Sequence, residues 1–332
     1  MLKIGIIGLG VGEQHLLAFD AHPDCAVTAI CDFDRQKLAE VSARFPKVLT
    51  FSEDKHILED PEIDVVSIAS FDQFHCAQVV SALCNGKHVF VEKPICLSAE
   101  ELEKIKKASL EAPDLLISSN LILRKAPRFR QLRRDIRNNR LGEIYSIEGD
   151  YNYGRLHKII SGWRAEAEFH SVVYGGAIHL IDLMLWLSED AVVEASAFGT
   201  GIATKDTSFK FHDAVTAILR FKSGAIGKVA ANYSCVFPHF HNLNVYGTKA
   251  SFVQNHLGGA AIYSSRDPDI SPDLVESAYP GARKGDMIPS FINAVLKGKD
   301  PEVTKDEVFR AMEVAIAIEN AAGSGAVIKL SQ

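Results

Sequence analysis

The chain lacks the cysteine spacing of a disulfide framework or of a zinc site. Its six cysteines include no C-x-x-C pair, so we expect a reduced, cytoplasmic interior. It also lacks any run of about 18 apolar residues that could span a membrane. The apolar stretch at residues 4–12 is too short and too glycine-rich for the core of a signal peptide. These absences predict a soluble protein with no membrane partner.

The chain also lacks the excess of positive charge, the low-complexity tracts and the fixed-period repeats that mark other classes of protein. Its formal net charge is −6, which argues against a nucleic-acid partner. Residues 1–122 hold 11 Lys and Arg and 19 Asp and Glu, a net charge of −8, whereas residues 123–332 hold 25 and 23, a net charge of +2. A slightly basic second half fits a small anionic ligand, although chance surface composition explains the difference equally well.

At 332 residues the chain is long enough for two domains. Short apolar strands alternate with helical stretches over residues 1–122, which predicts an α/β Rossmann domain with a doubly wound parallel sheet. The expected strands are 2–7, 26–31, 48–51, 64–69, 88–91 and 115–118, and the expected helices are 14–21, 35–44, 74–83, 99–110 and one that begins near residue 53.

The pattern changes beyond residue 122, where longer strands with antiparallel character replace the alternation. Residues 123–332 therefore read as an α+β domain with a large, mainly antiparallel open sheet. Lys222-Ser223-Gly224 is expected to turn two of its strands into a hairpin. The expected strands are 143–151, 193–199, 214–221 and 225–233, and the expected helices are 127–138, 175–187, 286–296 and 305–322.

The stretch G-L-G-V-G-E-Q-H follows the first strand, with glycines at Gly8, Gly10 and Gly12. At such a strand-to-helix turn, backbone N–H groups and the positive end of a helix dipole meet a pyrophosphate, and glycine allows its close approach. The spacing departs from G-x-G-x-x-G. Glycines at the end of any buried strand would look similar, so this turn alone is a weak signal.

Asp32 ends the second strand, about 20 residues after the glycines, where a carboxylate accepts hydrogen bonds from the adenosine ribose and repels a 2′-phosphate. NAD is therefore favoured over NADP. Arg35 lies three residues further on and keeps NADP open as an alternative. A surface aspartate in a turn is the structural alternative for Asp32.

Two further segments close the fourth and fifth strands, where ligands bind in open α/β sheets. The first, residues 70–75, contains Ser70, Phe71 and His75, and the second is Glu92-Lys93-Pro94. The proline restricts the turn, through a cis bond in one interpretation. A partly buried lysine ammonium in such a turn can hydrogen-bond a substrate hydroxyl and help its proton to leave.

Taken together, these segments resemble the Gfo/Idh/MocA family, the relatives of glucose-fructose oxidoreductase and inositol dehydrogenase, over essentially the whole chain. The match includes Gly8, Gly10 and Asp32, the segments I-A-S-F-D-Q-F-H (68–75) and G-K-H-V-F-V-E-K-P (86–94), and G-G-A-I-H-L-I-D (175–182). The resemblance implies hydride transfer between nicotinamide and a sugar or cyclitol carbon, with Lys93 close to the reacting hydroxyl. It also implies cofactor contacts by Gly8, Gly10, Val11, Gly12, Asp32, Ser70, Phe71, His75, Glu92 and Lys93.

The family often has G-x-G-x-x-G-x-x-H at its first turn. In this chain Gly12 and His15 keep the last spacing, so the missing residue lies between Gly10 and Gly12. We expect a turn one residue shorter in which Gly8 and Gly10 still cover the pyrophosphate.

The family also often carries an Asp four residues before a His, and a further Asp three residues after it. His179 and Asp182 match the second part, whereas Gly175 occupies the position of the first Asp. A histidine can take the hydroxyl proton as hydride leaves, so His179 is the expected general base and Lys93 its electrostatic partner. The group that orients His179 in place of the missing acid stays open; the candidates are Asp182, His170, His157 and Tyr174.

Cations and aromatic rings of the second half suggest a sugar-binding surface that would also suit an anionic substrate. The expected substrate-binding residues are Arg124, Arg155, Trp163, Arg164 and Asp182. Residues 124–140 hold eight basic residues, but apolar residues recur there at helical spacing, so a solvated helix face is favoured over a nucleic-acid site. His239 and His241 have no third ligand at metal-like spacing, and we expect no metal.

These observations predict an NAD-dependent oxidoreductase that acts on a secondary hydroxyl of a sugar, a nucleotide sugar or a cyclitol. A non-catalytic NAD sensor and an NAD-dependent glycosidase on the same fold are the alternatives. From the resemblance we also expect a homodimer or homotetramer, assembled through the open sheet.

Overall fold

The computed structural model describes residues 1–255 and 258–330. Its contacts divide the chain into two compact units. The first unit comprises Met1–Ile122 and Arg283–Met312, and the second comprises Leu123–Ala282 and Glu313–Gln332. The boundary after residue 122 coincides with the expected one. The second expected domain, 123–332, needs a correction because residues 283–312 return to the first unit.

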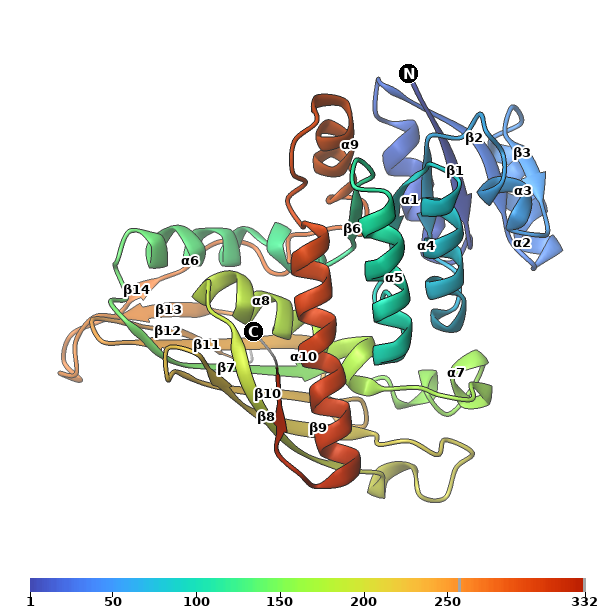
Figure 1. Ribbon diagram of the computed structural model, residues 1–332. Helices are drawn as coiled ribbons and strands as arrows, with labels where there is room; N and C mark the ends of the chain where they lie inside the picture. The colour runs from blue at the N-terminus through green and yellow to red at the C-terminus, as the bar shows by residue number, and fades with distance from the viewer. Residues whose placement is uncertain (256–257, 331–332) are drawn as a thin grey trace. The chain divides into compact units, whose positions relative to one another are not determined.

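The first unit contains a six-stranded parallel sheet in the order β3-β2-β1-β4-β5-β6, the strand order of a Rossmann fold. Its short, apolar strands are mainly buried, as expected for a parallel sheet covered on both faces, except the edge strand β3, whose residues are exposed or half-buried. Figure 1 shows α1, α4 and α5 beside the sheet. The strands are β1 (Leu2–Ile7), β2 (Cys25–Cys31), β3 (Leu49–Phe51), β4 (Val65–Ile68), β5 (His88–Val91) and β6 (Ile117–Ser119). The α-helices of residues 1–122 are α1 (Gly12–Asp20), α2 (Arg35–Arg44), α3 (Lys55–Leu58), α4 (His75–Cys84) and α5 (Ala99–Glu111).

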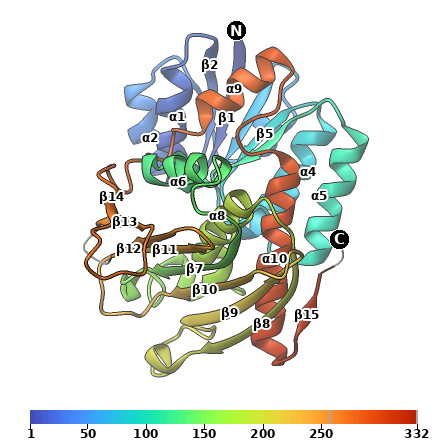
Figure 2. The ribbon, with the colours of Figure 1, turned by 90° about the vertical axis from the view of Figure 1, so that its left-hand side faces the viewer.

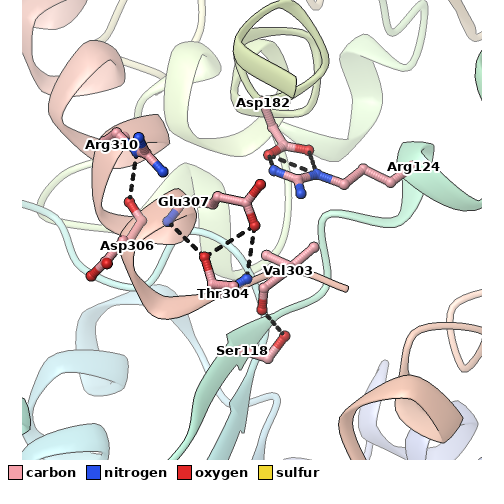
Figure 3. Close-up of polar contacts among 8 residues, drawn as sticks. All are labelled: Ser118, Arg124, Asp182, Val303, Thr304, Asp306, Glu307 and Arg310. Carbon is pink, nitrogen blue, oxygen red and sulfur yellow. Dashed lines mark hydrogen bonds and ion pairs between the residues drawn. The ribbon is translucent and has the colours of Figure 1, made fainter. Parts of the chain in front are cut away.

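Residues 283–312 join the first unit through α9 (Ile288–Lys297) and the beginning of α10 (Lys305–Ser324). The rings of Phe291 and Phe90 lie 5.6 Å apart, so α9 covers β5 with apolar side chains. The Ser118 hydroxyl donates to the Val303 carbonyl at 2.8 Å (Figure 3). These contacts join segments that are far apart in the sequence, and local patterns do not predict them.

The second unit is built on a nine-stranded sheet in the order β14-β13-β12-β11-β7-β10-β9-β8-β15. Its neighbouring strands are antiparallel except β7 and β10, which confirms the expected mainly antiparallel sheet. The expected hairpin joins β9 and β10, and Gly224 adopts a φ of +94° in its turn. The strands are β7 (Ile144–Asn152), β8 (Val192–Thr200), β9 (Ala214–Phe221), β10 (Ile226–Asn232), β11 (Phe240–Gly247), β12 (Ser251–Gln254), β13 (Ala260–Tyr263), β14 (Asp273–Leu274) and β15 (Ile328–Lys329).

Helices α6 (Pro127–Arg137) and α8 (Ile178–Ser188) lie over one face of this sheet (Figures 1 and 2). Helix α8 packs closely on β7 because Gly149 has no side chain; a Cβ there would meet the Met184 methyl at 3.0 Å. Helix α6 buries Phe129 and Leu132, in agreement with the expected apolar face of this basic segment. Among the helices of the described residues, none is long and apolar enough to cross a membrane.

Candidate functional site

A cavity of about 640 Å³ opens at the carboxyl ends of β1, β2, β3 and β4 in the first unit. Such an edge is where open α/β sheets bind ligands. Five of the expected cofactor residues line it, namely Gly8, Gly10, Asp32, Ser70 and Phe71. The strand topology therefore brings together residues from three separate expected motifs.

The shortened glycine turn presents unused backbone donors beside this cavity. Gly8 has a φ of +84°, and a Cβ there would lie 2.4 Å from the Ala69 carbonyl oxygen, so only glycine fits. A Cβ at Gly10 would meet no atom within 4 Å. Within the part of the chain that the structure describes, the N–H groups of Gly10, Val11 and Gly12 donate to no backbone acceptor outside α1. Helix α1 begins at Gly12, so a pyrophosphate fits this turn in spite of the missing residue.

Asp32 both shapes the turn and faces the cavity. Its Oδ2 accepts the Leu9 N–H at 2.6 Å, and its Oδ1 accepts the Asp34 N–H at 2.9 Å. Each carboxylate oxygen can accept a second hydrogen bond, so these contacts leave capacity for ribose hydroxyls. Asp32 is only 9% exposed, so it is not a surface residue, although its hydrogen bonds do lie within a turn.

The rim around Asp32 is acidic. Asp34, Glu53 and Asp54 also line the cavity, and the cation among the lining residues, Lys37, pairs with Glu13 at 2.5 Å. This hydrogen bond holds the pKa of Glu13 below its usual value. The negative potential at this edge disfavours a 2′-phosphate and favours NAD.

Sequence reasoning missed two parts of the cavity wall. The Phe33 ring lies 5.3 Å from that of Phe71, tilted by 57°, and Phe33 is 69% exposed. Residues 52–54 follow β3. The rule that ligands bind beyond the carboxyl ends of the strands, applied to every strand, could have identified both.

Glu92 lies in a buried hydrogen-bond network behind the Lys93 turn. Its Oε1 accepts the Asn120 side-chain N–H at 2.8 Å and lies 3.3 Å from His15 Nε2. His15 is fully buried, and its Nδ1 lies 3.0 Å from the Ser67 hydroxyl. Burial by itself would raise the pKa of Glu92, but the His15 hydrogen bond and the nearby positive charge of Lys93 outweigh it, so the pKa is lowered. Glu92 is thus an ionised carboxylate that positions the turn.

The turn at Lys93 is held from its other side by His75. The Lys93–Pro94 peptide bond is cis, as one interpretation expected. His75 Nδ1 lies 2.6 Å from the Pro94 carbonyl oxygen, and its Nε2 lies 3.1 Å from the Ser70 carbonyl oxygen. His75, expected to contact the cofactor, is 1% exposed and links the cavity wall to the Lys93 turn.

In the second unit, His179 lies in the first turn of α8, directly after a π-helical segment, Val173–Ala177. Its ring is perpendicular to that of His241, with centroids 6.1 Å apart. His179 is 8% exposed. Single-turn π segments are frequent at functional sites, and this one contains Gly175, at the position where the family often has an Asp.

Arg124 and Asp182, both expected to bind substrate, pair with each other instead (Figure 3). Arg124 Nε and Nη2 lie 2.9 and 2.5 Å from the two carboxylate oxygens. Each side chain is 1% exposed. This pair ties the segment before α6 to α8.

The remaining expected substrate residues follow β7: Arg155 lies in the connecting loop, and Trp163 and Arg164 lie in the short helix α7 (Trp163–Glu166). Arg155 stacks over the ring of Tyr153 at 5.3 Å, and Arg164 lies 4.5 Å from the ring of Trp163. Of the other candidates for orienting His179, His170 and Tyr174 are buried and His157 is exposed. His170 packs against the rings of Trp163, Phe209 and Tyr233.

His239 and His241 lie 4.9 Å apart, ring to ring, and both pack against Tyr151. The described residues contain no group of three or more His, Cys, Asp or Glu side chains that could hold a metal ion. The backbone N–H of His241 and its Nδ1 lie 3.2 and 3.0 Å from the Tyr279 hydroxyl, so this imidazole has a fixed orientation.

Comparison with known families matches both parts of the chain. Residues 2–118 match the oxidoreductase family model GFO_IDH_MocA, described as an NAD-binding Rossmann fold, and residues 129–253 match the GFO/IDH/MocA C-terminal domain. Together these matches cover well over half of the chain.

Individual relatives agree. The chain is 23% identical to myo-inositol 2-dehydrogenase of Thermotoga maritima, over 100% of this chain and 99% of that protein. It is 28% identical to scyllo-inositol 2-dehydrogenase (NAD(+)) of Bacillus subtilis, over 88% and 85%. A structure of levoglucosan dehydrogenase with NADH and levoglucosan has the same fold, with a TM-score of 0.86, 22% identity and full coverage of both chains. The chain belongs to the GFO/IDH/MocA oxidoreductase family, and its first unit is the NAD-binding Rossmann fold of that family.

Proposed function

We propose that this protein is an NAD-dependent dehydrogenase that acts on a secondary hydroxyl of a sugar, a nucleotide sugar or a cyclitol. The observation that carries the proposal is the cavity at the carboxyl edge of the parallel sheet, with unused N–H groups on one side and Asp32 on the other. The names of the relatives support the substrate class, since they are inositol and levoglucosan dehydrogenases.

In this proposal the cavity holds the adenosine and pyrophosphate part of NAD. The N–H groups of Gly10, Val11 and Gly12 donate to the pyrophosphate, aided by the α1 dipole. Asp32 accepts the ribose hydroxyls, and the rings of Phe33 and Phe71 offer apolar contact to adenine. His75 and Glu92 act indirectly, by holding the Ser70 and Lys93 turns.

When bound, the nicotinamide supplies the hydride acceptor for the carbon that carries the hydroxyl. His179 takes the proton of that hydroxyl as general base. Lys93 donates a hydrogen bond to the same oxygen and stabilises the negative charge that develops on it. Glu92 keeps the Lys93 turn in place and lowers the cost of a charged ammonium beside it.

We propose that Arg155, Trp163 and Arg164 bind the substrate directly. Guanidinium groups stacked on aromatic rings suit hydroxyls and also a carboxylate or phosphate, so the substrates include anionic sugars. Because Arg124 and Asp182 pair with each other, we assign them a structural role. A cytoplasmic location is supported by the six cysteines, all of which are free thiols, and a homo-oligomer is supported by the exposed face of the second sheet.

A substrate panel tests the activity. Formation of NADH is measured at 340 nm with myo-inositol, scyllo-inositol, levoglucosan, UDP-N-acetylglucosamine and a hexuronate, with NAD or NADP. We expect turnover with at least one substrate and a preference for NAD. Lys93→Ala and His179→Ala should each lower kcat/KM at least tenfold, about 1.4 kcal/mol. A variant that retains activity within tenfold disproves the role of that residue.

The same panel separates the alternatives. Tight NAD binding without hydride exchange on any substrate would indicate a sensor. Release of an aglycone from a glycoside without net NADH would indicate an NAD-dependent glycosidase. Thermal shift with NAD provides an independent measure of cofactor binding, because a ligand that binds only the folded state raises Tm with its concentration.

A further inference from the structure

Gly175 and Gly176 precede His179 at a place where no side chain fits. A Cβ at Gly175 would lie 2.6 Å from the Tyr233 hydroxyl oxygen, and a Cβ at Gly176 would lie 2.6 Å from the Tyr151 ring. Neither glycine has a positive φ. The two glycines are therefore required for space and not for an unusual backbone conformation.

The Tyr233 hydroxyl consequently occupies the position of a side chain at residue 175. That position lies four residues before His179, about one helical turn, and faces the same side of the helix. His170 Cε1 lies 3.7 Å from the same Cβ position. A phenol from the end of β10 thus stands where the family pattern leads one to expect a carboxylate.

The Tyr233 ring, which carries this hydroxyl, is tightly packed. Tyr233 is 3% exposed, and its ring centroid lies 4.5 Å from that of Tyr153 and 5.7 Å from that of Tyr151. Tyr151 also packs on His241 at 4.8 Å, and His241 packs on His179. The rings form one continuous cluster from Tyr233 to His179, which restricts the rotamers of each member.

We propose that Tyr233 is the positioning residue for His179 in this protein, in place of the missing acid. A phenol both donates and accepts a hydrogen bond, so it can orient the surroundings of an imidazole. It adds no negative charge there, unlike a carboxylate. The inference rests on the proposed function, because it assumes that His179 is the general base.

Tyr233→Phe removes the hydroxyl and retains the ring. With the substrate identified by the panel, we expect kcat to fall about tenfold while KM changes less than twofold, and NAD affinity to stay the same. The apparent pKa of the acid limb of kcat/KM against pH should shift by at least half a unit, an effect that a purely structural role would not produce. Tyr145→Phe is the matched control, since this exposed tyrosine of β7 should leave kcat and the pH profile unchanged.

A double-mutant cycle tests the contact itself. Gly175→Ala places a methyl group 2.6 Å from the Tyr233 hydroxyl, whereas without that oxygen the next ring atom is 3.6 Å away, an ordinary contact. Gly175→Ala should therefore lower Tm and kcat in the wild-type background and have little further effect on Tyr233→Phe. If Gly175→Ala lowers Tm and kcat equally in the wild-type and Tyr233→Phe backgrounds, residue 175 does not contact the Tyr233 hydroxyl.

The outcomes separate this inference from the proposed function. If His179→Ala is inactive but Tyr233→Phe keeps the wild-type kcat and acid limb, the positioning role is wrong and the proposed function stands. If His179→Ala remains active, or no substrate is oxidised, the proposed function fails and this inference fails with it. If kcat falls in Tyr233→Phe but the acid limb of kcat/KM against pH does not shift, the hydroxyl contributes only to packing and the positioning role is wrong.

Discussion

Glu92, in the first unit, contributes both to the stability of the fold and to the proposed function. It is an ionised carboxylate with 13% of its side chain exposed, and it is stabilised by Asn120, His15 and Lys93. A buried charge with good partners is tolerated, whereas removing it leaves those partners unsatisfied. Its lowered pKa links stability to pH.

We predict that Glu92→Gln lowers the free energy of unfolding at pH 7 by about 1–3 kcal/mol. The folded pKa lies below the unfolded value of 4.5, so the stabilisation is present above pH 4.5 and is lost as the pH falls below it. The difference in the free energy of unfolding between wild type and Glu92→Gln should therefore become smaller at lower pH. Urea unfolding between pH 7 and pH 3 measures it.

Glu111→Gln is the control for this prediction, because this glutamate is exposed at the end of α5. Its effect should stay within about 0.5 kcal/mol at neutral pH. An unchanged gap between Glu92→Gln and wild type down to pH 3 would show that Glu92 is not ionised in the folded protein.

At the scale of elements, the Arg124–Asp182 pair joins the segment that leads into α6 to the middle of α8. Both partners are almost fully buried. The Arg124 guanidinium also lies 5.6 Å from the Trp186 ring. This ion pair therefore fixes α8, the helix that contains His179, to the segment before α6.

Arg124→Met or Asp182→Leu should lower the free energy of unfolding by about 3–5 kcal/mol, because each leaves a buried charge without its partner. The double variant Arg124→Met/Asp182→Leu should lose much less than the sum of the two. Denaturant unfolding measures all three. Additive losses would contradict the pair as the source of the effect.

Arg137→Met serves as the comparison for these variants. Arg137 pairs with Glu189 on the surface, with 60% of its side chain exposed. A surface ion pair contributes about 0–1 kcal/mol, so this variant should remain close to wild type in stability.

At the scale of the whole molecule, one face of the nine-stranded sheet exposes apolar side chains. Phe198 is 76% exposed, Ile226 54% and Ile218 50%. The strand register places them on the same face of β8, β9 and β10, since Phe198 pairs with Thr216 and Ile226 pairs with Arg220. An exposed apolar face of this kind marks an interaction surface, and it supports the proposed homo-oligomer.

We predict that the purified protein is a dimer or tetramer in light scattering. Phe198→Asp combined with Ile218→Asp should shift it to a monomer, because charges on this face oppose its burial. Leu110→Asp, which changes an equally exposed residue of α5 (79% exposed), should leave the assembly intact. A monomeric wild-type protein would contradict the proposed homo-oligomer. An unchanged assembly in the double variant would show that the interface lies elsewhere.

The sequence by itself determined the parallel sheet of the first unit, the antiparallel sheet of the second and the positions of Asp32 and Lys93 at strand ends. These features follow from periodicity and from the order of neighbouring elements, which are local properties. It also identified the cofactor turn, although the spacing was atypical. The helix that contains His179 was expected, but the π segment before it was not.

Only the tertiary structure decided how distant residues pair. Three features join segments that are far apart in the chain. Residues 283–312 belong to the first unit, Arg124 forms an ion pair with Asp182, and the Tyr233 hydroxyl lies beside Gly175. No local pattern specifies such partners, because they are selected by the packing of whole elements and by the need to satisfy buried charges and hydrogen bonds. For this reason the family resemblance indicated that an acid is missing before His179, and only the fold placed the Tyr233 hydroxyl beside Gly175.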